Sequence, residues 1–413
     1  MRQQHRFAIV AVLVWGTLDG AGILKPAIVH ADTVIIPSAA MSERYDSNIF
    51  RTPRSRQRAG TTAEDFISTV GGGVQVLHKS REVDARITAG ADANVFVNNP
   101  GLNFFTTRLE GTANLDGWVS QFVREAKLRV SENFQYTPET PGFVTGVGGE
   151  VQDPFLRGIQ GFRANTFSNT TSVEGSYRLD KTLSLEGRYF FATRRVGRVR
   201  AGGAVFFDTD VHAWRAGPRW EITPIDHIRL LSEQTLMSQS RSSSPTRGTF
   251  ETLTQTLSVN YNREMPDWTF GINGGVTLIE PADRAHATGG ITFSTHPERA
   301  TSIMLDLSRR VAPSFFLQGG VIISNVGRVQ LTQRLSERLY LSGSASYAYN
   351  ETVPIRSVIT NNITLSTSLN YNLTRNMILG LFYNHTDFKV NTSTNDFTVP
   401  RDEVGITLTT HWE

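Results

Sequence analysis

The sequence contains no cysteine and no long apolar segment beyond its N-terminus. The lack of cysteine agrees with export through an oxidising compartment, and it excludes a lipid anchor on an N-terminal cysteine. No stretch after residue 31 is apolar over the roughly 18 residues that a membrane-spanning helix needs, so helical spans are not expected in the rest of the chain. A chain that is 39% hydrophobic and 19% charged is also too apolar to be disordered.

The N-terminus has the three parts of a secretory signal peptide. Arg2 and Arg6 lie in its polar start, residues 7–18 form its apolar core, and Val29-His30-Ala31 is a small-x-small cleavage site. We therefore predict a cleaved signal at 1–31 and a single domain at 32–413. Residues 32–413 carry almost no net charge, so they lack the excess of basic residues that is typical of nucleic-acid binding.

From about residue 64 onward, apolar and polar residues alternate with a period of two. In the segment 104–118, Phe105, Leu109 and Leu115 alternate with Arg108 and Glu110. This pattern is typical of strands with one apolar and one polar face. The predicted strands are 33–49, 64–79, 82–97, 104–118, 119–137, 163–179, 182–195, 203–222, 226–240, 248–263, 267–279, 284–296, 299–311, 316–334, 337–351, 358–373, 376–390 and 399–412.

The connections between these strands alternate between short and long. Leu115-Asp116-Gly117 and Leu179-Asp180-Lys181 are examples of short connections, whereas 50–63 and 138–162 are long. An even number of strands with short periplasmic turns and longer external loops is typical of an outer-membrane barrel. We therefore predict an all-β, transmembrane, antiparallel up-and-down β-barrel of about 18 strands (16–20) in the bacterial outer membrane.

A soluble β-sandwich or a propeller also has many short strands. Both fit less well, because alanine, glycine and threonine share the apolar face and no repeat of about 40 to 50 residues is present. Aromatic residues also lie near predicted strand ends, as the two interfacial girdles of a barrel require. These aromatic residues are Trp118, Tyr189, Trp220, Trp268, Tyr340, Tyr371, Tyr383 and Trp412.

Short motifs resemble a known family. The run 42–50, SERYDSNIF, resembles the opening strand of the β-barrel porins and the exosortase- and exopolysaccharide-associated outer-membrane β-barrels of proteobacteria, and 308–313 and 327–339 resemble their late strands and turn. The resemblance implies export or secretion of a surface polysaccharide. One departure is that Trp412 is followed by Glu413, whereas such barrels usually end on an aromatic residue.

Charged residues in phase with the polar face are expected to point into the lumen, because a charge in lipid costs a few kcal/mol. They would form either a neutralising network that stiffens the wall or a set of groups that bind sugars. The candidates are Asp84, Arg86, Arg108, Glu110, Glu125, Lys127, Arg129, Glu186, Arg188, Arg229, Glu233, Arg328 and Arg334.

Arginine outnumbers lysine among the basic residues, and arginine binds phosphate and carboxylate bidentately. Two clusters in predicted external loops could contact lipopolysaccharide phosphates or an acidic polysaccharide, although an ordinary solvated surface would look the same. They comprise Arg51, Arg54, Arg56 and Arg58 in one loop and Arg194, Arg195, Arg198 and Arg200 in another. By analogy with general porins, Glu139, Glu150 and Asp153 in the long break 138–162 could line a constriction.

We expect no catalytic, cofactor or metal site. The chain has no Gly-x-Ser-x-Gly, no His-x-x-x-His pair and no glycine-rich phosphate loop. The expected function is a pore or conduit for export of an exopolysaccharide or another surface polysaccharide. The alternatives are a general small-solute porin and a non-conducting scaffold barrel of an export assembly. The expected partners are outer-membrane lipid, lipopolysaccharide, a polysaccharide substrate and periplasmic export proteins.

Overall fold

The computed structural model describes residues 32–51, 53, 62–137, 164–199, 207–241, 249–280, 284–295, 300–313, 321–353, 358–392 and 396–412. The predicted signal peptide at 1–31, Glu413 and the predicted acidic loop residues Glu139, Glu150 and Asp153 lie outside these ranges.

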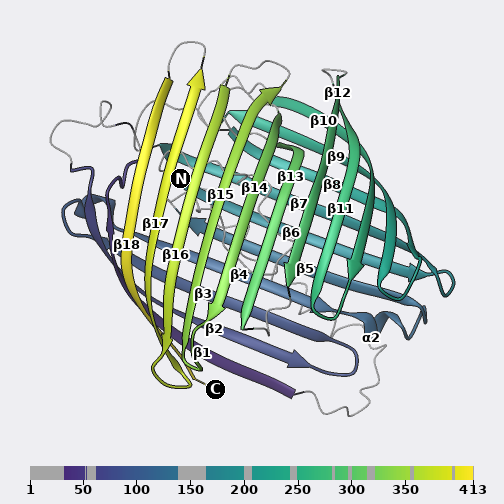
Figure 1. The fold of residues 1–413 in the computed structure, drawn as a ribbon, viewed down its shortest axis with the longest axis horizontal. Helices are drawn as coiled ribbons and strands as arrows, with labels where there is room; N and C mark the ends of the chain where they lie inside the picture. The colour runs from purple at the N-terminus through teal and green to yellow at the C-terminus, as the bar shows by residue number, and fades with distance from the viewer. Residues whose placement is uncertain are drawn as a thin grey trace, which may run out of the picture.

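The described residues form 18 antiparallel strands in one sheet. Each strand pairs with its neighbours in the chain, and β1 also pairs with β18, so the sheet closes on itself (Figure 1). The strands are β1 (Asp32–Asp46), β2 (Asp65–Lys79), β3 (Asp84–Phe96), β4 (Phe104–Asn114), β5 (Ala126–Thr137), β6 (Ala164–Arg178), β7 (Leu183–Val199), β8 (Phe207–Glu221), β9 (Asp226–Arg241), β10 (Thr249–Glu264), β11 (Trp268–Glu280), β12 (Arg284–Thr295), β13 (Thr301–Pro313), β14 (Val321–Arg334), β15 (Leu339–Val353), β16 (Val358–Asn372), β17 (Met377–Thr392) and β18 (Asp396–His411).

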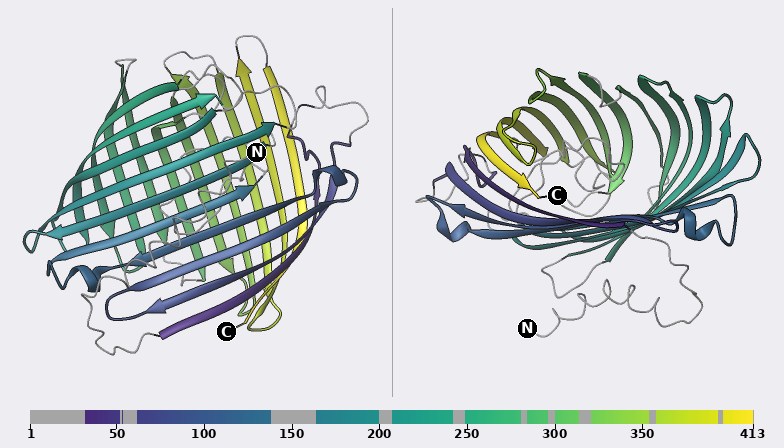
Figure 2. Two further views of the ribbon diagram at one scale, coloured as in Figure 1. Left: turned by 180° about the vertical axis from the view of Figure 1, so that it is seen from behind. Right: turned by 90° about the horizontal axis from the view of Figure 1, so that it is seen from below.

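The number of strands and the up-and-down order confirm the predicted barrel. Asp32 at the start of β1 and His411 at the end of β18 lie at the rim with the short turns, which is the periplasmic rim in this class of barrel. Seen from below, the strands curve into a ring (Figure 2). None of the described residues belongs to a helix that is long and apolar enough to span a membrane.

One short turn was predicted wrongly. The predicted strands 104–118 and 119–137 are shorter, and a helical turn, α2 (Asp116–Val119), lies between β4 and β5. Trp118 and Phe122 pack edge to face with ring centroids 5.5 Å apart, and the backbone N–H of Trp118 donates to the carbonyl of Glu82. The apolar residues at 118 and 122 therefore follow the period of a helix rather than that of a strand.

The external end of β1 is also shorter than predicted, because the chain turns at Asp46. The Asp46 carboxylate accepts the backbone N–H of Asn48 at 2.9 Å, which is a local turn that competes with the strand ladder. A second short helix, η2 (Pro100–Leu102), lies in the predicted break between β3 and β4.

Candidate functional site

Solvent exposure separates the lipid face of the barrel from its lumen face. On β3, Val95 is 48% exposed whereas the next residue, Phe96, is 1% exposed. On β4, Phe105 is 69% exposed and marks the outward positions, so Arg108 and Glu110 alternate to the other face. The same alternation runs through the other strands, because successive side chains of a strand point to opposite faces.

Most of the predicted lumen residues lie on strands, opposite the exposed apolar side chains. Glu125 is the exception: it is an exposed residue of the connection between α2 and β5, because α2 replaces the start of the predicted strand. The candidates on the lumen face are Asp84, Arg86, Arg108, Glu110, Lys127, Arg129, Glu186, Arg188, Arg229, Glu233, Arg328 and Arg334.

Several of these candidates meet in one cavity on the wall formed by β5 to β9. The cavity has a volume of about 300 Å³ and lies toward the periplasmic rim. Its ionisable lining consists of five basic and three acidic side chains, so positive charge is in excess. The basic side chains are Lys127, Arg129, Arg188, Arg215 and Arg229, and the acidic ones are Asp116, Glu174 and Glu186.

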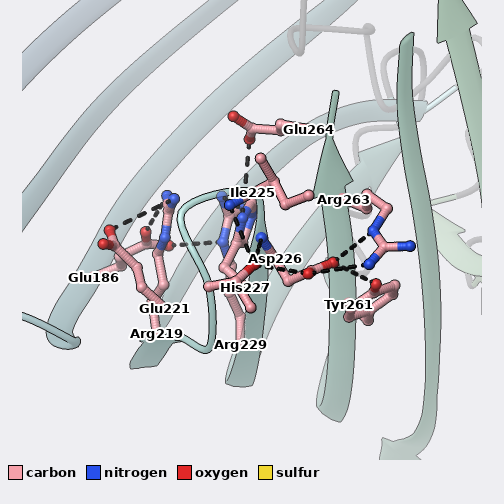
Figure 3. Close-up of polar contacts among 11 residues, drawn as sticks. Glu186, Arg219, Glu221, Ile225, Asp226, His227, Arg229, Tyr261, Arg263 and Glu264 are labelled. Carbon is pink, nitrogen blue, oxygen red and sulfur yellow. Dashed lines mark hydrogen bonds and ion pairs between the residues drawn. The ribbon is translucent and has the colours of Figure 1, made fainter. Parts of the chain in front are cut away.

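Carboxylates hold the arginines of this cavity in place (Figure 3). Glu186 accepts from Arg219 Nη1 at 3.4 Å and lies 3.4 Å from Arg229 Nε through its other oxygen. Arg188 Nε lies 3.1 Å from a carboxylate oxygen of Glu174. All these side chains are partly exposed, so the network stiffens the wall while leaving guanidinium surface open to the lumen.

Two neighbouring residues at the start of β9 face opposite sides of the wall. His227 is buried on the lumen side, with Nδ1 3.9 Å from a carboxylate oxygen of Glu264. Asp226 lies on the other side and accepts from Tyr261 Oη at 2.6 Å and from Arg263 Nε at 2.8 Å (Figure 3). The Asp226 cluster therefore fastens the periplasmic turn from the membrane side and takes no part in the lumen.

The wall opposite the cavity carries mainly hydroxyl groups. On β15 and β16 the lumen positions face each other as hydroxyl pairs, such as Ser344 with Ser366 and Ser346 with Thr364. A charged pair on this side is Asp306 opposite Arg328 on β13 and β14. The lumen is thus asymmetric, with ionic groups concentrated on one wall and hydroxyl groups on the other.

Sequence reasoning missed three residues of the charged wall: Glu174, Arg215 and Arg219. Each of them alternates in phase with lumen positions of its strand. Arg215 is in phase with Val211 on β8, and Val211 is 2% exposed. That phase was the signal that could have identified them.

The predicted external arginines do not form one exposed surface among the described residues. Arg194 lies within β7 and is buried on the lumen face, and Arg51 is also buried, so neither side chain presents its guanidinium to the external surface. Arg195 is exposed and pairs with Asp210 at 2.8 Å. Arg198 lies in β7, whereas Arg54, Arg56, Arg58 and Arg200 lie outside the described residues.

The external end of the lumen has a different character. Buried apolar side chains from ten strands form a cluster there, and Val211, Met237, Ile279 and Phe388 are among its least exposed members. The barrel interior therefore changes from charged side chains near the periplasmic rim to this cluster of buried apolar side chains, the apolar collar, near the external end. Across the described ranges, no group of three or more histidine, aspartate or glutamate side chains could hold a metal ion.

A closed 18-stranded antiparallel barrel with an apolar outer face and a polar, charged interior has the architecture of an outer-membrane β-barrel. Residues 292–410, which include β13 to β17 and nearly all of β18, match the model of the family described as "Putative beta-barrel porin 2". The match confirms the resemblance to β-barrel porins over this part of the chain and its place in the bacterial outer membrane. No curated protein matches the chain.

Solved structures with a similar arrangement of strands share little sequence identity with this chain, and one of them, OpdK, is described as an outer membrane protein. OpdK from Pseudomonas aeruginosa is 12% identical, with a TM-score of 0.43 over 92% of this chain and 99% of that one. OpdO from Pseudomonas aeruginosa is 11% identical, with a TM-score of 0.44 over 92% and 97%. OccAB3 from Acinetobacter baumannii is 11% identical, with a TM-score of 0.43 over 92% and 99%.

Proposed function

We propose that this porin is an aqueous conduit for small hydrophilic solutes and that it prefers anions. The observation that carries the proposal is the cavity on the β5–β9 wall, where five basic side chains outnumber three acidic ones. A barrel of 16 to 18 strands encloses a channel rather than a packed core. Fixed positive charge in a narrow aqueous passage concentrates anions and repels cations.

The arginines also suit carboxylates and phosphates better than lysines would. A guanidinium presents a planar set of donors and is weakly hydrated, so it can pass an anion along a wall through successive bidentate contacts. The hydroxyl wall of β15 and β16 offers donors and acceptors to the uncharged part of such a solute. Transport needs no nucleophile or metal, and we propose no catalysis.

The expectation that the cargo is a surface polysaccharide goes further than these observations. The family description names a porin and no cargo. The charged cavity does not distinguish a polymer from a small solute. The contact with lipopolysaccharide and with periplasmic export proteins likewise stays a prediction.

The zero-current potential of the refolded porin in a planar bilayer, across a gradient of KCl, tests the proposal. We expect the sign that corresponds to excess chloride permeability. Replacing Arg188, Arg215 and Arg229 by glutamine should move the potential toward zero or toward cation preference, because only two basic side chains then remain among the residues that line the cavity.

A matched control removes the same charge from the periplasmic turns. Arg81, Arg338 and Arg375 are exposed and lie outside the strands, so their replacement by glutamine should leave the potential unchanged. Cation selectivity of the unmodified protein, or equal effects of the two triple variants, would contradict the proposed anion preference.

A further inference from the structure

The ladder between β12 and β13 is interrupted. Only Gly289–Ser294 of β12 pair with Met304–Arg309 of β13. On their other sides, β12 pairs with β11 and β13 pairs with β14 along their whole lengths. The next rung would join Thr288 and Arg310, and it is missing. The wall therefore separates at its external half, where the ring of strands is visibly open when seen from below (Figure 2).

The separation lies within the membrane. On β11, the outward residues Val276 and Leu278 are 49% and 44% exposed and face Ala287 and Ala285 of β12 across the ladder. These apolar side chains lie on the lipid face, so the separated part of β12 is at the height of lipid. An edge of unpaired backbone groups is costly there unless other groups satisfy it.

Arg309 lies where the strands part. It occupies an outward position of β13, two residues after Leu307, which is 44% exposed on the lipid face. Its Nε donates to the carbonyl oxygen of Ala287 at 3.1 Å, and its Nη1 donates to Asn325 Oδ1 at 2.8 Å. An arginine on the lipid face costs energy, and an ionisable residue inside a membrane is by default a candidate functional group.

More positive charge surrounds the opening on its lumen side. Arg310 and Arg284 are exposed residues of the two separated strand ends. The Nε2 atom of His286 is shielded from solvent and has no hydrogen-bond partner among the described residues.

The lumen behind the opening is apolar. Ile279, Ala312 and Ile322, on the strands that flank the separation, are at most 4% exposed and belong to the apolar collar. A molecule that passes the opening would thus meet arginine at the edge and aliphatic side chains inside. An anionic head with an apolar body fits both surfaces.

We propose that the gap between β12 and β13 is a lateral opening through which an anionic amphiphile, with a carboxylate or phosphate head and an apolar chain, moves between the lumen and the outer leaflet. This function goes beyond the aqueous conduit. It would hold even if the porin conducted no ions, since the route does not follow the axis of the barrel.

The absence of cysteine from the sequence allows a clean test with single labelled cysteines. Thr288→Cys places a bimane label on the lumen side of the separated part of β12, and Thr292→Cys places it on the same face in the paired part, opposite Asp306. Both variants are reconstituted in phosphatidylcholine vesicles, after a heat-modifiability gel confirms that they fold. A long-chain fatty acid with bromine atoms in its chain quenches bimane on contact.

We expect the brominated fatty acid to quench the label at 288 more strongly than the label at 292. In the background Arg309→Gln/Arg310→Gln, the concentration that gives half of the quenching at 288 should rise about tenfold, the loss expected for one charge-assisted hydrogen bond. Arg334→Gln, at the periplasmic end of β14, is the matched control and should cause no change.

Equal quenching at 288 and 292 would contradict a lateral opening between β12 and β13. Two results would contradict an anionic ligand. One is quenching at 288 that is unchanged when the two arginines are replaced, and the other is equal quenching by brominated phosphatidylcholine in the vesicle. Selective, arginine-dependent quenching by the fatty acid supports the proposal in full.

Discussion

The closing seam between β1 and β18 contains a buried ion pair whose removal should be costly. Arg401 Nε lies 3.0 and 3.1 Å from the two carboxylate oxygens of Asp46, and Arg401 Nη2 also donates to Glu403 at 2.7 Å. The side chains of Arg401 and Asp46 are 7% and 1% exposed. Removing one partner of a buried pair leaves an uncompensated charge and costs about 3–5 kcal/mol.

Arg108 and Asp92 form the natural control, because they are a cross-strand pair in the open lumen. Their side chains are 48% and 18% exposed. Water and salt screen such a pair, so its loss costs about 0.2–1 kcal/mol. Arg401→Gln should therefore destabilise the barrel several times more than Arg108→Gln.

Reversible urea unfolding in phosphatidylcholine vesicles, followed by tryptophan fluorescence, measures the difference. With a slope of about 3 kcal/mol per molar urea, Arg401→Gln should lower the midpoint by about 1 M or more. The double variant Asp46→Asn/Arg401→Gln should regain part of the loss, because it removes the stranded charge as well. Equal midpoints for Arg401→Gln and Arg108→Gln would refute the reasoning.

Two further predictions concern periplasmic turns. The carboxylate of Asp180 accepts hydrogen bonds from the backbone N–H groups of Thr182 and Leu183, and these bonds lower its pKa from 3.8. The carboxylate therefore stabilises the folded state above pH 3.8. This stabilisation is lost as the pH falls through the lower pKa of the folded state. Asp180→Asn should therefore flatten the acid dependence of the unfolding midpoint, and an unchanged dependence would count against this role. A Cβ on Gly117 would lie 2.0 Å from the carbonyl oxygen of Arg81, whereas one on Gly101 would meet nothing within 4 Å. Gly117→Ala should lower the free energy of unfolding by about 1–3 kcal/mol in the same urea assay, and Gly101→Ala should lower it much less. Similar decreases for the two variants would show that α2 does not pack tightly on the β2–β3 turn.

The alternation of side chains predicted the barrel well because every strand has one face toward lipid and the other toward the barrel interior. Where another force acts, alternation fails. Trp118 and Phe122, spaced as on a helix, pack on each other, and Trp118 bonds to the neighbouring turn, so 116–119 is helical where the continued alternation of the preceding strand predicted more strand. Local hydrogen bonds of Asp46 end β1 early for a similar reason.

The candidate site was predictable in outline only. Phase along a strand placed Arg129, Arg188 and Glu186 on the lumen face, but the alternation does not fix the register that brings them to one height in the wall. Arg194 illustrates the same limit, because its burial depends on side chains of distant strands at the external end of the lumen. The separation of β12 from β13 is a property of register, which the alternation of these two strands does not reveal.

Single-channel recording shows directly whether the barrel conducts. The purified chain without residues 1–31 is refolded, shown to be a folded barrel by heat-modifiability, and added to a planar bilayer in KCl. We expect discrete, steady current steps as ions pass the charged wall of β5 to β9. A folded barrel that inserts and never passes current would contradict the conduit and favour a scaffold role.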